Sequence, residues 1–360
     1  MTLTADVALA DQKSDAASAS SAFKLGFFTQ VPGNTGQSPA SVYSELIDTI
    51  VAAEELGYES VWIGQHHFGL GSGQLPSPLV LLAAVAARTS RIQLGTAITV
   101  LPLEDPVRLA EDAAVLDVIS GGRVNLGLGS GGGDRASFTA FGIPHEDRRE
   151  AFDVKLATLH TLLDGGSLTP DDDPRRLHPA APGLRHRLWH SVGTPDRAAA
   201  SAAHGDGLLI GTFSDHPQRE QRAKIDAYLA EWSARGHALP PRIGALRFTY
   251  VGESRASIET QVEQELNAFR EFANEYKPEL AELDTPGYLR RVTRYGTVED
   301  VIGDLRDDPA LVGLVTHFLP TVGLYPAAGR STPGADLDIR RLQVMAEEIA
   351  PALGWQRPGH

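Results

Sequence analysis

The stretch IQLGTAITVLPLEDPVRLAEDAAVLDVISGGRVNLGLGSG, residues 92–131, predicts one strand–helix–strand unit. Its apolar residues 92–100 are typical of a buried strand. Asp105 and Pro106 predict a helix start, because Asp accepts from the free N–H groups of a first turn and proline fits that turn. Apolar residues at helical spacing continue to about residue 120, and a Gly-Gly pair then precedes a second apolar strand at 124–128.

The same unit is repeated on both sides of this stretch. Before it, strands are expected at 23–28 and 60–64, each followed by a Ser-Pro helix start, at Ser38 and at Ser77. Alternating strands and helices require parallel pairing with right-handed crossovers. Further strands are expected at 188–192, 208–211, 243–251 and 311–318. Together these make the eight strands that close a barrel, so we predict an α/β fold, a (β/α)8 TIM barrel with insertion loops.

A doubly wound Rossmann sheet is the alternative fold. Gly127, Gly129 and Gly132 match the pattern G-x-G-x-x-G, and Glu150 follows at about the spacing that the dinucleotide-binding fingerprint uses. That fingerprint belongs to the first strand–helix turn, whereas here three expected strands precede it. It should also open a helix, but residues 136–144 end in a Gly-Ile-Pro breaker. The barrel is therefore favoured.

Composition divides the chain into a tail and one domain. Residues 1–22 are rich in Ala, Ser and Asp and are expected to form a disordered N-terminal tail. Residues 23–355 are expected to form a single barrel domain. Two stretches, about 165–187 and 278–295, interrupt the strand–helix alternation and are expected to be irregular insertions. The second contains Arg290, Arg291 and Arg294, and long structureless segments of this kind are often lids.

Charge and composition exclude several classes of function. The chain has 360 residues, a net charge of −14 and no cysteine. An acidic surface repels phosphate backbones, so no nucleic-acid partner is expected. Without cysteine the chain can form no disulfide and use no catalytic thiolate. The absence of cysteine fits a reducing cytoplasm. Neither a secretory signal nor a membrane segment is recognisable, so we expect a cytoplasmic protein with no membrane partner.

Two segments carry a family resemblance, and two others support it. GYESVWIGQHHF, residues 57–68, and the stretch 92–131 are the most distinctive, while LWHSVGTPDRAAASAAHGDGLLIG, residues 188–211, and YGTVEDVIGDL, residues 295–305, match more weakly. With these segments the chain resembles the bacterial luciferase-like flavin-dependent monooxygenases. The resemblance implies a barrel that binds reduced FMN at the carboxyl ends of its strands. The FMN is supplied by a separate flavin reductase, and molecular oxygen is used to oxidise a small organic substrate. A homodimer is also implied.

The resemblance implies specific cofactor-binding residues. It places a non-prolyl cis peptide at Ala97–Ile98, beneath the flavin ring. It places Ser130 and Gly131 beside the flavin phosphate, although well-known members of the family have Arg where this chain has Ser130.

Gly193 and Thr194 match a second phosphate-binding loop at a helix start. A hydroxyl and helix N–H groups suit a dianion there. A plain N-cap role for Thr194 is equally compatible with the pattern.

His66 is the catalytic candidate, because it follows a strand directly and the family's luciferases use the first His of this pair. A histidine with a pKa near neutrality can serve as acid or base. Where the family often has Glu before the pair, this chain has Gln65. Asn125, a polar residue within a strand, is a candidate flavin contact or a satisfied core amide. His317 is expected near the end of the last strand, at a pocket or at the rim.

These residues are also compatible with two other functions. One is a deazaflavin-dependent oxidoreductase of the same superfamily, which passes hydride without oxygen, and the departure at Ser130 keeps it open. The other is a non-catalytic flavin-binding barrel. No metal site is predicted, because H-E-x-x-H is absent and the adjacent His66 and His67 are poorly spaced for one ion.

Overall fold

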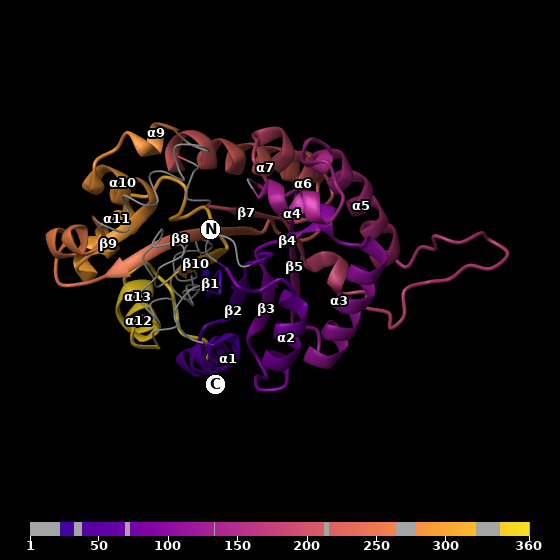
Figure 1. The fold of residues 1–360 in the computed structure, drawn as a ribbon, viewed down its shortest axis with the longest axis horizontal. Helices are drawn as coiled ribbons and strands as arrows, with labels where there is room; N and C mark the ends of the chain where they lie inside the picture. The colour runs from indigo at the N-terminus through magenta and orange to yellow at the C-terminus, as the bar shows by residue number, and fades with distance from the viewer. Residues whose placement is uncertain are drawn as a thin grey trace, which may run out of the picture.

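The computed structural model describes residues 22–31, 38–68, 73–132, 134–211, 216–263, 278–321 and 339–359. Eight parallel strands close into a barrel with helices around it (Figure 1). The barrel strands are β1 (Lys24–Thr29), β2 (Ser60–Ile63), β3 (Gln93–Thr96), β5 (Val124–Gly129), β6 (Leu188–Ser191), β7 (Gly207–Ile210), β8 (Ile243–Val251) and β10 (His317–Thr321). Pairing of β10 with both β1 and β8 closes the ring, so the predicted (β/α)8 fold is confirmed.

Two short strands extend this barrel, and helices surround it. β4 (Thr99–Val100) pairs with β5, and β9 (Thr293–Gly296) pairs with β8. The α-helices are α1 (Pro39–Leu56), α2 (Pro78–Ala86), α3 (Pro106–Ser120), α4 (Arg135–Ala140), α5 (Arg148–Leu163), α6 (Pro195–Ala203), α7 (Arg222–Arg235), α9 (Pro278–Ala281), α10 (Thr285–Val292), α11 (Val298–Arg306), α12 (Ile339–Val344) and α13 (Ala350–Ala352). Short 3₁₀ or π turns are η1 (Leu101–Leu103), η2 (His145–Asp147), η3 (Leu184–Arg187), η4 (Pro217–Gln221) and η5 (Met345–Ile349). None of the helices in the described ranges has the length and apolar character needed to span a bilayer.

Local signals explain where the helices begin and end. Ser38 accepts a hydrogen bond from the Ser41 N–H at the start of α1, and Asp105 accepts two at the start of α3. The Ser77 side chain precedes α2 without making a cap hydrogen bond. Gly57 ends α1 with φ of 94°, a backbone conformation that glycine adopts without steric cost.

The interior of the barrel is filled by an apolar cluster. Its buried members are Phe28, Trp62, Trp189, Leu209 and Leu319. The two tryptophan rings meet edge to face, with centroids 5.2 Å apart. They fit because glycines face them: a Cβ at position 95 or 207 would lie within 2.5 Å of a tryptophan ring. The barrel is therefore a packed core, and chemistry is confined to its ends.

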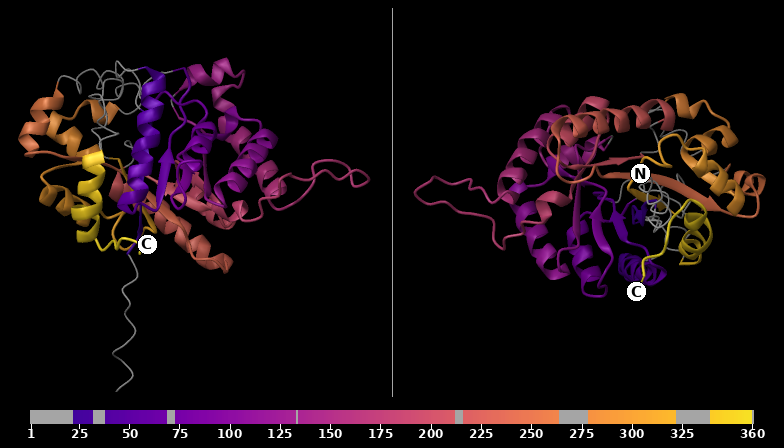
Figure 2. Two further views of the ribbon diagram at one scale, coloured as in Figure 1. Left: turned by 90° about the horizontal axis from the view of Figure 1, so that it is seen from below. Right: turned by 180° about the vertical axis from the view of Figure 1, so that it is seen from behind.

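The two predicted insertions differ in the structure, because one contains helices and a strand and the other has mostly irregular backbone. Residues 278–295 are not irregular, because they contain α9, α10 and part of β9. Arg294 is buried there and pairs with Asp308 at 2.8 Å, so it is not a lid residue. Residues 165–187 do lack helix and strand, apart from one bridge between Ser167 and Arg176 and the 3₁₀ turn η3. This segment follows α5 and projects from the barrel (Figures 1 and 2).

Three other expectations from the sequence either differ from the structure or lie partly outside the described residues. The last strand begins at His317, not near residue 311, because residues 308–315 form turns whose Leu311 and Val315 are buried. The expected N-terminal tail, apart from Ala22, lies outside the described residues. The apolar spacing of residues 258–276 also predicts a helix; residues 255–263 are helical, and residues 264–276 lie outside the described residues.

Candidate functional site

Four loops that carry candidate residues lie together at the carboxyl ends of neighbouring strands. Strand register pairs Ile63 with Thr96, Val100 with Gly129, and Gly129 with Ser191. The loops that follow these residues therefore leave the barrel side by side, at its upper end in the left view of Figure 2. This is the end at which barrels of this kind carry their active sites.

His66 lies half-buried directly after β2, beside the Ala97 carbonyl. A Cβ at Gly64 would lie 3.6 Å from His66 Nε2 and 3.6 Å from the Ala97 oxygen. The imidazole and the carbonyl oxygen are therefore both close to the backbone of Gly64. A Cβ at Gly73 would lie 2.3 Å from the His66 ring. The ring can occupy this position because residue 73 has no side chain.

Burial keeps His66 in its neutral form. Desolvation lowers the pKa of His66 below its ordinary value, His67 adds to this, and Asp134 opposes it. A neutral imidazole has one donor nitrogen and one acceptor nitrogen. His66 can therefore accept or relay a proton at neutral pH.

The peptide bond between Ala97 and Ile98 is cis, as the resemblance implies. It lies in a gap of the ladder with β5, which pairs with β3 as far as Gly95 and with β4 from Thr99 onward. The Thr96 hydroxyl bridges the gap by donating to the Gly127 carbonyl (2.7 Å) and accepting from its N–H (2.9 Å). The sequence reasoning missed Thr96, although a threonine inside an apolar strand was a visible signal.

Ser130 and Gly131 follow β5 and form the next wall of the site. Gly131 has φ of 76°, and a Cβ there would lie 2.9 Å from the Phe138 ring, so glycine is required on both counts. A Cβ at Gly129 would lie 2.9 Å from the Ile98 side chain. The absence of side chains at these positions lets Ile98 approach β5 closely.

Gly193 and Thr194 lie at the exposed start of α6. The Thr194 hydroxyl accepts from the Arg197 N–H at 3.4 Å, which makes it an N-cap. No atom lies within 4 Å of a Cβ built at Gly193. Thr194 therefore caps α6, and the backbone at Gly193 is accessible to a ligand.

Asn125 does not join these residues, and its expected flavin contact is corrected. It is the second residue of β5, and its amide accepts from Trp189 Nε1 (3.0 Å) and donates to Gln93 (3.2 Å). It lines a cavity of about 420 Å³ at the amino-terminal end of the barrel, together with His317. Both polar residues point inward, but their positions early in their strands put them at the opposite end from His66.

Gln65 ties the loops around His66 together. Its side-chain oxygen accepts from the Val100 N–H (2.7 Å), and its nitrogen donates to the Pro76 carbonyl (3.0 Å) and to Glu104 (2.6 Å). Lys155 of α5 donates to the Glu104 carbonyl at 2.7 Å. The amide thus positions the loops after β2 and β3.

His67 and two exposed aromatic rings form the rim. His67 is 9% exposed, and its Nε2 has no hydrogen-bond partner within the described residues. Its ring lies 4.8 Å from that of Phe141, which is 44% exposed, and Phe68 beside them is 65% exposed. An unpaired buried nitrogen next to exposed aromatic rings suits a partly polar organic ligand.

Comparison with known proteins identifies the family. The chain belongs to the luciferase-like monooxygenase family, whose sequence model matches residues 23–314. It is 30% identical over 296 residues to 4-hydroxyprotoasukamycin monooxygenase of Streptomyces nodosus subsp. asukaensis, covering 75% of this chain and 77% of that protein. It is 40% identical over 175 residues to F420-dependent glucose-6-phosphate dehydrogenase of Kineococcus radiotolerans, covering 46% and 51%.

A solved structure agrees in fold. The oxygenating constituent of 3,6-diketocamphane monooxygenase from Pseudomonas putida, solved in complex with FMN, superposes with a TM-score of 0.70 at 16% identity. The match covers 91% of this chain and 98% of that one, and at this identity it shows the fold alone. The chain spans between 57% and 77% of the length of the first five curated relatives it matches.

Proposed function

We propose that the chain is a flavin-dependent monooxygenase that uses reduced FMN and molecular oxygen to oxidise a small organic substrate. One observation carries the proposal: His66, the cis peptide at Ala97–Ile98 and two glycine-containing loops meet at one end of a barrel of the luciferase-like family. Monooxygenation is favoured over F420-dependent hydride transfer because the monooxygenase relative aligns with three-quarters of the chain, whereas the F420-dependent relative aligns with less than half.

The residues present fit a bound flavin. The open backbone at Gly193 and the exposed N-terminus of α6 suit the phosphate, with Ser130 and Gly131 on the adjacent strand end. The backbone at Ala97 and Ile98 would support the ring, and the unpaired His67 Nε2 offers a polar contact. Bound reduced FMN would supply the electrons that activate oxygen.

The protein's own contribution is proton handling and shelter. His66 is neutral and half-buried, so its imidazole can accept a proton from the substrate or deliver one to it. The packed cluster below the site and the aromatic rings at its rim would restrict the access of water to a bound flavin.

A deazaflavin-dependent oxidoreductase is the second candidate. The Kineococcus relative is F420-dependent and 40% identical in the aligned region. Ser130 also takes the place of the Arg that the resemblance associates with the FMN phosphate. On this alternative the same barrel end would hold F420, and hydride would pass without oxygen.

Partners follow from the same proposal. The chain would receive reduced FMN from a separate flavin reductase and would act in the cytoplasm. It would also form a homodimer, and three exposed apolar side chains one turn apart on α3 support this. Their exposures are Val115 44%, Val118 58% and Ile119 59%.

Oxygen uptake with a flavin reductase, NADH and FMN tests the activity against a panel of small organic substrates. We expect one class of substrate to give a product containing an added oxygen atom, and the His66→Asn variant to lose this product by at least about 100-fold. His186→Asn, an exposed change at the other end of the barrel, is the matched control. Anaerobic reduction of a substrate with reduced F420, and no product with FMN, would overturn the proposal.

A further inference from the structure

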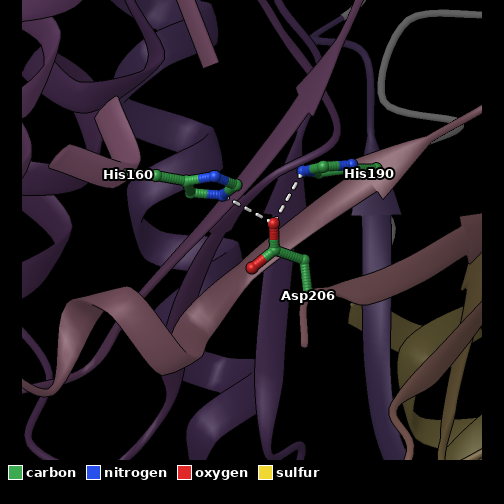
Figure 3. Close-up of side chains that lie close together, drawn as sticks. All are labelled: His160, His190 and Asp206. Atoms are coloured by element: carbon green, nitrogen blue, oxygen red, sulfur yellow. Dashed lines mark hydrogen bonds and ion pairs between the residues drawn. The ribbon is translucent and has the colours of Figure 1, made fainter. Parts of the chain in front are cut away.

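Three side chains with metal-ligand atoms meet outside the barrel. His160 lies on α5, His190 on β6, and Asp206 in the turn before β7 (Figure 3). Asp206 Oδ2 is 2.8 Å from His160 Nε2 and 3.1 Å from His190 Nε2, and the three atoms lie within 4.8 Å of one another. His190 points toward the helices, because its neighbour Trp189 belongs to the cluster inside the barrel. The cluster is therefore separate from the flavin site.

The cluster is shielded from water. The exposed fractions of its side chains are 0% for Asp206, 3% for His190 and 12% for His160. A buried carboxylate needs hydrogen bonds or cations to offset its lost hydration. Arg185 Nη1 approaches Asp206 Oδ1 at 2.5 Å, so that oxygen is compensated. The other oxygen faces the two imidazole nitrogens (Figure 3).

Hydrogen bonds behind His190 decide which of its nitrogens carries the proton. Ser201 Oγ, on α6, donates to the Arg197 carbonyl at 3.0 Å and lies 2.9 Å from His190 Nδ1. With the single hydroxyl proton donated to the Arg197 carbonyl, Nδ1 is the donor toward Ser201. His190 Nε2 then directs a lone pair at Asp206 and makes no hydrogen bond with any described residue. A cation between these two acceptors, which lie 3.1 Å apart, would satisfy both.

We propose that His160 Nε2, His190 Nε2 and Asp206 Oδ2 bind a divalent transition metal ion, with Zn²⁺ as the best fit. Two imidazoles and one carboxylate form a ligand set that Zn²⁺ uses, with water in the fourth position. Ligand atoms about 2.1 Å from a tetrahedral ion lie about 3.4 Å apart. The 2.8 and 3.1 Å contacts would lengthen by about half an ångström. The two imidazole nitrogens, which lie within 4.8 Å of each other, would approach by up to about 1.4 Å.

The surroundings match what metal-bound side chains need. His190 Nδ1 hydrogen-bonds with Ser201 Oγ at 2.9 Å, which orients the ring, and Arg185 holds the second carboxylate oxygen of Asp206. The ion would join α5, β6 and the turn before β7. No residue of the flavin site takes part, so the metal would stabilise the fold without entering the oxygenation.

Metal content and stability of the untagged full-length chain test this proposal. After chelator treatment and loading with Zn²⁺, we expect elemental analysis to find one zinc per chain and Tm to rise. His190→Ala and Asp206→Asn should each abolish tight zinc binding. His237→Ala, in a half-buried histidine whose ring hydrogen-bonds with the Ala202 carbonyl and packs on Trp232, should retain it.

Two further measurements keep the test decisive if a ligand variant fails to fold. Ser201→Ala leaves all three ligands in place and should weaken zinc binding by about 10- to 100-fold in competition with a chelating dye. Co²⁺ loaded in place of Zn²⁺ should give the visible absorption of a four-coordinate ion. A wild-type chain that takes up no zinc, with an unchanged Tm, would overturn the proposal and leave the cluster as a histidine–carboxylate ion pair.

Discussion

Thr96 is fully buried, and its hydroxyl satisfies both the N–H and the carbonyl of Gly127. Replacement by valine keeps the shape and removes both hydrogen bonds, leaving two backbone groups unpaired in the sheet. We expect Thr96→Val to lower the free energy of unfolding by about 2–4 kcal/mol. Urea unfolding measures this.

Thr139→Val is the matched control for Thr96. The exposed hydroxyl of Thr139 donates only to the Arg135 carbonyl within α4, so the change should stay within about 0.5 kcal/mol. Equal stability changes in the two variants would show that the bridge across the β3–β5 gap is not a stabilising feature.

His317 predicts a pH dependence of stability. Burial, with the charges of Lys24 and Arg242, lowers the pKa of His317 to about 3 from an ordinary 6.5. Between these values the unfolded chain binds a proton that the folded chain does not, so stability falls as pH falls through this window. Above pH 6.5 His317 is neutral in both the folded and the unfolded chain, so it does not make stability depend on pH.

The His317→Asn variant removes this contribution. Relative to its own stability at pH 7.5, it should lose about 2 kcal/mol less than the wild type on acidification to pH 4.5. Urea unfolding at the two pH values measures the difference, with His186→Asn as an exposed control. An identical loss in wild type and His317→Asn would mean that His317 is not held neutral.

At the scale of elements, the loop at residues 73–76 positions His66. The His66 N–H donates to the Leu75 carbonyl at 2.9 Å, and a Cβ at Gly73 would collide with the His66 ring at 2.3 Å. We expect Gly73→Ala to displace the ring and reduce substrate turnover by about 10- to 100-fold, because misplacement by about 1 Å costs that much.

The control for this prediction is Gly303→Ala in α11. No atom lies within 4 Å of a Cβ there, and alanine favours the helix. Turnover should stay at the wild-type level in Gly303→Ala. Full turnover in Gly73→Ala as well would argue against a role for the His66 ring.

Local signals predicted some elements well and others poorly. Ser38 and Asp105 each act next to the helix that they start, so the boundaries of α1 and α3 could be predicted from neighbouring residues alone. α10 and β9 were missed because they are short and polar, and Arg294 in β9 is buried only through its pairing with Asp308. That pairing depends on the tertiary fold.

The candidate site was predictable where it follows strand ends and not elsewhere. His66 and Ala97 lie together because the ends of parallel strands meet. Asn125 was misplaced because the alternation of a strand gives the face of a side chain, not its distance along the barrel axis. The His160, His190 and Asp206 cluster was invisible in the sequence, since 30 and 16 residues separate its members.

At the scale of the whole molecule, we predict a dimer through α3. Its exposed Val115, Val118 and Ile119, at 44%, 58% and 59% exposure, lie one turn apart on the helix, and a second copy would cover them. We expect a dimer by light scattering and a monomer for the Val118→Glu, Ile119→Glu double variant. Val312→Glu, in a residue 49% exposed outside this helix, should remain dimeric. A monomeric wild type would contradict this prediction.

The central claim is that this barrel binds reduced FMN at the carboxyl ends of its strands. An anaerobic titration with reduced FMN, followed by admission of oxygen while the flavin absorbance is recorded, tests it most directly. We predict saturable binding, weakened in a Gly193→Val variant, and slower reoxidation of bound than of free flavin. No binding of reduced FMN, with saturable binding of reduced F420 in its place, would contradict the claim.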